Sequence, residues 1–105
     1  NGLTPIKSTI EGVVTIADLV ADPMGFTGKK VKIQGQVVKV NESIMDRNWI
    51  HLVDGSADDY DFVITTNVSF PVGHTVAFEG LISTNRDFGA GYKYELLMED
   101  AVTIK

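Results

Sequence analysis

The fold is decided by the stretch Val31-Lys32-Ile33-Gln34-Gly35-Gln36-Val37, in which apolar and polar side chains alternate. Alternation with a period of two is typical of a β-strand that buries one face, and the pattern continues to Val40. Gly35 falls in the inner row, where a strand glycine marks the bend or bulge of a sheet that curls into a barrel. The other side chains expected to face inward are Val31, Ile33 and Val37.

Four more segments on the C-terminal side show the same period, and we predict strands at residues 47–53, 60–66, 75–82 and 92–99. Gly80 lies in the inner row of the third of these four, which implies a second point of curling. We expect a linker at residues 41–46, a turn at 71–73 and a loop at 83–91. The inner rows are predicted to be Ile50 and Leu52; Phe62 and Ile64; Val76, Phe78 and Ile82; and Tyr94, Leu96 and Met98.

A short helix is predicted before the strands. Thr15 stands in the N-cap position with Asp18 three residues later, and Asp22-Pro23 ends the run. So short a helix is marginal alone, so its apolar residues should plug one end of the barrel; they are Ile16, Leu19 and Val20. Residues 24–28 read as a turn. Residues 1–14 show no clean period and are taken as an N-terminal extension.

Five short strands, two strand glycines and little helix predict an all-β fold: a five-stranded, OB-fold-like barrel with a short N-terminal helix. A two-sheet sandwich usually has about seven strands. No internal repeat or linker divides the chain, so residues 15–105 are predicted to form a single domain.

Composition limits the chemistry of the chain. The 105 residues include no cysteine, which excludes disulfides, thiolate metal sites and a cysteine nucleophile. The net charge of −5 disfavours nucleic-acid binding, although the segment from Lys29 to Lys39 is basic. No apolar run is long enough to cross a bilayer. A start at Asn1 without methionine suggests a mature product whose secretion signal has been removed.

We expect no catalytic residue, no metal and no cofactor. His51 and His74 lack the spaced partners of a zinc site. The turn with Asp54, Asp58, Asp59 and Asp61 does not match the spacing of an EF-hand, so it is read as a solvated turn. Residues 89–91 (Gly-Ala-Gly) lie between two predicted strands and are read as a hairpin tip, not a phosphate cradle. An enzyme is therefore not expected.

Residues 28–41 and 44–55 resemble a family of bacterial OB-fold proteins that are described, from their fold, as nucleic-acid-binding lipoproteins. The specific parts are Asn48-Trp49-Ile50-His51-Leu52 and Asp87-Phe88-Gly89-Ala90-Gly91-Tyr92. The likeness covers roughly residues 15–101. It implies an exported protein of the periplasm or cell envelope. The lipobox cysteine is absent, so a lipid anchor would belong to a removed N-terminal portion.

The OB-fold also implies a site, because its ligands lie across the second and third strands between two loops. The platform would be Arg47, Trp49 and His51, with Lys32 and Gln34 on the neighbouring strand and a clamp of Arg86, Phe88 and Tyr92. The loop 83–91 would be mobile and close over Trp49. In the alternative interpretation, the N-terminal segment or this loop covers Trp49, which then extends the core, and Phe88 packs permanently at the rim.

Three functions follow from this site. The leading hypothesis is a non-enzymatic binding module of the bacterial envelope with an unknown oligomeric or protein ligand, anchored on the Trp49 face. The second is single-stranded nucleic-acid binding, which the basic segment supports and the acidic total opposes. The third is a structural domain that binds other subunits through an apolar patch.

Overall fold

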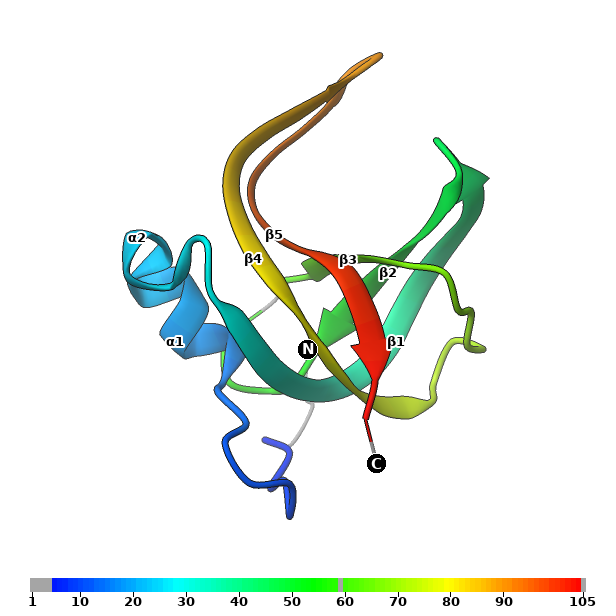
Figure 1. The fold of residues 1–105 in the computed structure, drawn as a ribbon. Coiled ribbons are helices and arrows are strands. Elements are labelled where there is room, and N and C mark those ends of the chain that lie inside the picture. Colours follow the sequence, from blue (N-terminus) through cyan, green and yellow to red (C-terminus); the bar gives the residue numbers. More distant parts are fainter. Residues whose placement is uncertain (1–4, 59, 105) are drawn as a thin grey trace.

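The computed structural model describes residues 5–58 and 60–104, which are mostly β-strand (Figure 1). Neither helix in this part of the chain is long and apolar enough to cross a membrane. The elements are α1 (Ile16–Ala21), α2 (Pro23–Phe26), β1 (Lys30–Ile44), β2 (Arg47–Val53), β3 (Phe62–Thr66), β4 (Thr75–Gly89) and β5 (Tyr92–Thr103).

The five strands form one sheet that closes in a ring, in the order β1-β2-β3-β5-β4. All neighbouring strands are antiparallel except β3 and β5, which are parallel. β1 closes the ring by pairing twice, because residues 30–36 pair with β4 and residues 36–44 pair with β2. The prediction of a mostly β chain with five strands in one curved sheet is confirmed.

Gly35 lies where β1 passes from one partner to the other. A Cβ at this position would lie 2.6 Å from the carbonyl oxygen of Val53 and 2.8 Å from Cγ of Leu52. At Gly80, a Cβ would lie 2.6 Å from Cγ of Met98. Both strand glycines therefore allow a close approach between neighbouring strands where the sheet curls, as the sequence indicated.

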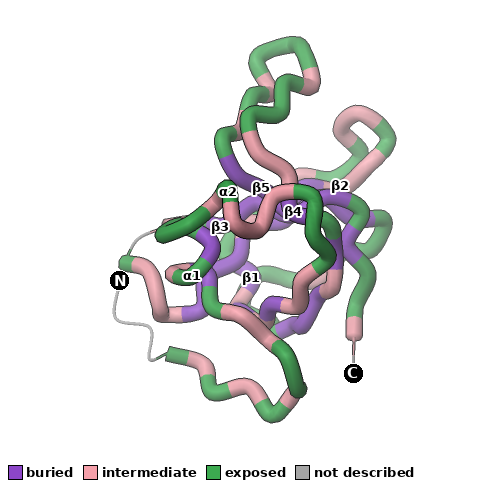
Figure 2. The backbone as a smooth tube through the Cα atoms, turned by 60° about the vertical axis from the view of Figure 1, so that its left-hand side comes forward, coloured by how far each residue is buried: buried purple, intermediate pink, exposed green. Residues whose placement is uncertain are grey.

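One hydrophobic core is formed by buried residues of all five strands, and Figure 2 shows the buried stretches of the backbone gathered in the strands of the ring. The predicted inner rows of β1 to β4 contribute to it, as do Leu96 and Met98 of β5. Ile16 and Leu19 of α1 pack against the same core, and the Thr15–Asp18 capping box begins the helix as predicted. Val20 was predicted to join them, but its side chain is exposed because it lies on the outer side of α1.

The turn after β2 holds the start of α1. The buried carboxylate of Asp54 accepts hydrogen bonds from the backbone N–H of Ile16 at 2.9 Å and from the N–H and hydroxyl of Ser56. The hydroxyl of Ser56 accepts one from the N–H of Ala17 at 2.9 Å. The acidic turn was read as solvated, which is correct for the exposed Asp58 and Asp61 and wrong for Asp54; Asp59 lies outside the described residues.

The N-terminal extension, which was assigned no element, contacts the sheet at two places. The N–H of Ile6 donates to the carbonyl of Asp54, and Val13 forms a single parallel bridge with Lys32. Two shorter corrections concern the chain after α1. The predicted turn at residues 24–28 is in part helical, because residues 23–26 form α2, and Pro23 in its first turn favours that helix. β3 begins at Phe62 rather than Tyr60.

Two long hairpin arms are the main departure from the predicted strand boundaries. β1 and β2 run through the predicted linker 41–46, and β4 and β5 run through the predicted loop 83–91. Each arm ends in a two-residue turn with positive φ at both residues: Met45-Asp46 (55° and 61°) and Ala90-Gly91 (55° and 86°). Positive φ at both residues is typical of a type I′ turn, which usually carries Asn-Gly. Neither sequence has that signal. The hairpin tip at residues 89–91 was nevertheless predicted, whereas the turn at Met45-Asp46 was read as part of a linker.

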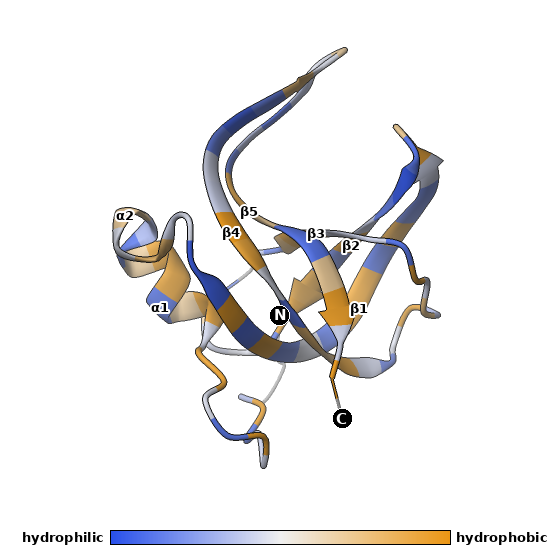
Figure 3. Ribbon diagram, in the orientation of Figure 1, coloured by the Kyte–Doolittle hydropathy of each residue, from blue (hydrophilic) through white to orange (hydrophobic). Residues whose placement is uncertain are grey.

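The arms leave the ring on the same side (Figure 1). Figure 3 shows hydrophilic residues along the part of β4 that extends into its arm. Polar residues there were read as a loop, although a solvent-facing strand carries them equally well. β5 also continues beyond the predicted residue 99 to Thr103.

Candidate functional site

Trp49 is buried, with a side chain only 1% exposed. It lies on the outer side of β2, as predicted, but its own chain covers it. The indole Nε1 donates a hydrogen bond of 2.9 Å to the carbonyl oxygen of Ile44. The prediction that Trp49 is an accessible platform is therefore wrong, and the alternative in which it extends the core is correct.

The cover over Trp49 is a second apolar cluster outside the ring. Tyr94 stacks on the indole with ring centroids 5.5 Å apart, Phe88 meets it edge-on at 5.1 Å, and Tyr92 lies at 5.3 Å. The remaining members of this cluster are Val63, Leu97, Ile44 and Met45. Since they come from both arms and from β3, the two arms close over the face where the indole was expected to be exposed.

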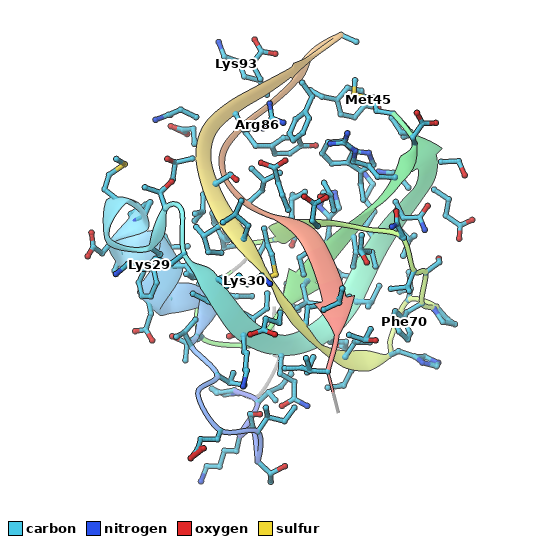
Figure 4. All side chains as sticks on the ribbon, in the orientation of Figure 1. Lys29, Lys30, Met45, Phe70, Arg86 and Lys93 are labelled. Carbon is cyan, nitrogen blue, oxygen red and sulfur yellow. The ribbon has the colours of Figure 1, made fainter. Side chains whose placement is uncertain are left out.

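The outer surface of this cluster is aromatic and cationic. Phe88, Tyr92 and Tyr94 are only partly buried. The guanidinium carbons of Arg86 and Arg47 lie 4.4 Å and 5.1 Å from the centroid of the Phe88 ring, distances typical of cation–π contacts. Figure 4 shows Arg86 and Met45 on the two arms, on either side of the space between them. We call these five residues the aromatic–arginine face: Arg47, Arg86, Phe88, Tyr92 and Tyr94.

Each arginine of the face is held in place by a second contact. Nε of Arg86 lies 3.0 Å from Oε2 of Glu99, whose side chain is largely buried. Nε of Arg47 donates to the carbonyl oxygen of Met45 at 3.1 Å. The pKa of Tyr94 is raised, first because burial disfavours its phenolate and second because Tyr92 is close. The hydroxyl of Tyr94 therefore stays neutral, and the charge of the face comes from its arginines.

A cleft of about 200 Å³ opens beside Arg47, and we call it the β3–β5 cleft. One wall is the end of β3 with the residues that follow it, and the other is the end of β5. The register changes here, because Ile64 pairs with Met98 but Thr66 pairs with Ala101, and Asp100 takes a left-handed φ of 54°. This irregularity interrupts the regular pairing of β3 with β5 where the cleft opens. The lining residues are Arg47, Thr65, Thr66, Asn67, Val68, Asp100, Ala101, Val102 and Thr103.

The structure brings together Arg47, Trp49, Arg86, Phe88 and Tyr92 from the predicted site. It does not bring Lys32 and Gln34 to them, because these residues pair with Glu79 and Ala77 of β4. Gln34 instead lines a different pocket, with Phe70 and His74 among its walls. The basic segment also starts away from the face, since Lys29 and Lys30 lie apart from Arg86 and Met45 in Figure 4.

His51 lies on the outer side of β2, beyond the aromatic cluster. Its Nδ1 is 3.7 Å from the carboxylate of Asp61. Burial lowers the pKa of His51, and Lys39 lowers it further, while Asp61 opposes both. Within residues 5–58 and 60–104, no group of three or more histidine, aspartate or glutamate side chains is placed to hold a metal ion.

Sequence reasoning missed Tyr94, Glu99 and the walls of the cleft. Tyr94 was placed in the inner row, since strict alternation with Leu96 and Met98 was assumed through the arm. Glu99 has no signal of its own, because its partner Arg86 was placed in a loop. The cleft depends on a bulge at Asp100, which no residue pattern announces.

No family model matches the chain, and no curated protein is significantly similar to it.

Proposed function

We propose that this chain is an OB-fold binding module without enzymatic activity, which takes an oligomeric or protein ligand across the aromatic–arginine face. The closed five-stranded sheet supports this assignment, as does the packing of side chains from the β1–β2 and β4–β5 arms against Trp49 of β2 and Val63 of β3. OB-folds bind oligonucleotides and oligosaccharides at that place.

The observation that carries the proposal is the shared position of two arginines on one aromatic ring. Arg47 from one arm and Arg86 from the other both lie over Phe88, which is itself partly exposed. Aromatic residues and arginine are the side chains enriched at the energetic centres of binding surfaces. Because the contacts already hold the face in place, a ligand would bind with little loss of side-chain entropy.

We place this module in the bacterial periplasm or cell envelope. The support is the likeness of residues 28–41 and 44–55 to exported OB-fold proteins. In that setting the oligomeric ligands at hand are glycans and protein chains, both of which tyrosine and arginine side chains contact well.

Single-stranded nucleic acid is the second candidate. Its support is again the pairing of aromatic rings with arginine, since stacking on such rings is worth about 1–3 kcal/mol per base. The net charge of −5 opposes it, as does the placement of Lys29, Lys30 and Lys32 beside β4 rather than on the face. We therefore rank it below a glycan or protein ligand.

The buried indole offers a direct test, because the chain has one tryptophan and Phe88 and Tyr92 cover it. Trp49 fluorescence would be titrated with three probes: an N-acetylglucosamine oligomer, a thymidine oligomer at low ionic strength, and pools from a random peptide library. We expect saturation with the glycan or with peptides. The response should be lost in Phe88→Ala and kept in Val72→Ala, which changes an exposed residue outside the face.

The outcomes separate the candidates. Saturation with the thymidine oligomer alone, abolished by moderate salt, would favour nucleic acid. No response to any probe, together with a dimeric mass in solution, would replace the proposal with an assembly domain. No response from a monomer would overturn it outright.

A further inference from the structure

We infer that the β3–β5 cleft binds the C-terminal residue of a peptide, with Arg47 contacting the terminal carboxylate and the cleft walls contacting a small aliphatic side chain. This inference deepens the proposed binding function and rests on it, since Arg47 belongs both to the face and to the cleft.

Arg47 provides an oriented positive charge. Its Nε is bound to the carbonyl of Met45, and its guanidinium lies over the rings of Phe88 and Trp49, at 5.1 Å and 6.0 Å. Asp100 also lines the cleft, yet no acidic side chain in residues 5–58 and 60–104 forms an ion pair with Arg47. Among the described residues the two terminal nitrogens therefore have no acidic partner, and the planar fork they form matches a carboxylate.

The walls of the cleft are suited to an extended chain. After Thr66, the exit of β3 is drawn toward β2, because Nδ2 of Asn48 donates to the carbonyl of Val68 at 3.0 Å. On the opposite wall, the N–H of Ile104 donates to the carbonyl of Ala77. Main-chain groups in an antiparallel pair alternate in direction, so the N–H and C=O of Thr103 point away from β4. They face the edge where β3 has ended, and a peptide backbone can pair with them there.

The apolar part of the cleft selects the side chain. Val68 and Val102, on opposite walls, are 38% and 58% exposed. Their methyl groups offer contact to an aliphatic side chain, which would leave water on binding. A cleft of about 200 Å³ is smaller than the roughly 300–1,000 Å³ of a pocket for a whole small ligand. It therefore fits one residue, and the rest of the peptide would lie outside it.

The test compares two forms of one probe, an acetylated tripeptide ending in valine with either a free C-terminal carboxylate or a C-terminal amide. Each is titrated into the isotope-labelled protein and followed by its backbone amide resonances. The free acid should shift the resonances of Asn67, Val68 and Thr103. It should bind about 10-fold more tightly than the amide, a difference of about 1.4 kcal/mol, because the amide lacks the charge that Arg47 would contact.

Two arginine variants locate the effect. Arg47→Gln should remove the preference for the acid, while Arg86→Gln, which changes the other arginine of the face, should keep it. Val102→Thr retains the shape of an exposed residue and should weaken both forms of the probe about equally. Folding of each variant is verified by the dispersion of the same spectra.

Equal binding of acid and amide to the wild-type protein, or a preference that survives Arg47→Gln, would overturn the inference. Failure of the tripeptide with continued glycan or peptide binding at Phe88 would remove the cleft as a subsite and leave the proposed function standing. If only the amide resonance of Arg86 shifts, and inorganic phosphate causes the same shift as the peptide, the site is a general anion site. That result would also overturn the inference.

Discussion

The indole of Trp49 and the carbonyl of Ile44 are joined by a hydrogen bond of 2.9 Å that ties the tip of the β1–β2 arm to the strand beneath it. Trp49→Phe would keep most of the ring contacts and remove this bond. We expect a loss of about 2 kcal/mol in unfolding free energy, from the unpaired carbonyl and the smaller ring. Urea unfolding followed by circular dichroism measures it, and unchanged stability would show that the bond contributes nothing.

Phe88→Ala should have an effect between those of a core residue and a surface residue. The ring is partly buried and contacts Trp49 and Tyr94 as well as both arginines. We expect a loss of about 1–2 kcal/mol, against roughly 3 kcal/mol or more for a fully buried phenylalanine. Phe62→Ala, inside the ring, supplies that comparison in the same thermal unfolding experiment. Equal losses would place Phe88 in the core and weaken its role as a binding residue.

Asp54→Ala should destabilise the protein far more than Asp58→Ala. The carboxylate of Asp54 is buried and accepts hydrogen bonds from Ile16 and Ser56, whereas Asp58 is exposed. Its loss leaves donors at the start of α1 without a partner, at a cost of about 2–3 kcal/mol. Amide hydrogen exchange should show that residues 16–21 lose protection in the Asp54 variant alone. Retained protection would mean that the capping box is sufficient for α1.

Gly35→Ala should be more damaging than Gly80→Ala. The new methyl group at Gly35 meets the backbone carbonyl of Val53, which cannot move without disturbing β2. At Gly80 the nearest atoms belong to the flexible side chain of Met98. We expect losses of about 3 kcal/mol and about 1–2 kcal/mol, measured by denaturant unfolding. The reverse order would mean that the sheet shifts more easily at its β1 bend than Met98 does.

The pKa of His51 is lowered from its ordinary value of 6.5, chiefly by burial. The unfolded chain therefore binds the proton more readily than the folded one. The stability that neutral His51 contributes is present above pH 6.5 and declines as pH falls from there toward the folded pKa. His51→Gln should remove this part of the pH dependence. The measurement is the melting temperature of both proteins at a series of pH values, with the difference between them plotted against pH.

The neighbours of His51 give a second measurement of the same effect. In an NMR titration of the imidazole, Asp61→Asn should lower the pKa further, and Lys39→Gln should raise it. If neither substitution moves the pKa, burial alone determines it.

Periodicity sufficed for the closed sheet because its inner rows are regular. Ile33, Ile50 and Phe78 each belong to a row of apolar residues at every second position, and all lie in the core. The helix was predictable for a different reason, since Thr15 and Asp18 are a local signal that needs no tertiary contact. These features depend on residues close together in the chain.

The site was less predictable because it depends on how the two arms meet. Trp49 lies on the outer side of β2, which would face solvent if the sheet had nothing packed on its outside. The rings of Tyr92 and Tyr94 form a second apolar layer that covers it. Alternation specifies only which side of a strand a residue occupies. Whether another segment lies over that side is a long-range matter, as is the bulge at Asp100 that opens the cleft.

The closure of the ring has a consequence for how the chain acquires its structure during translation. β5 is the last of these five strands to leave the ribosome, and it alone joins β3 to β4. Until it emerges, β3 and β4 each present an unpaired edge, and the core between them is open to water. Such edges invite pairing with other chains. A nascent chain stalled before residue 92 should therefore be the form that recruits chaperones, and release of β5 should end that need.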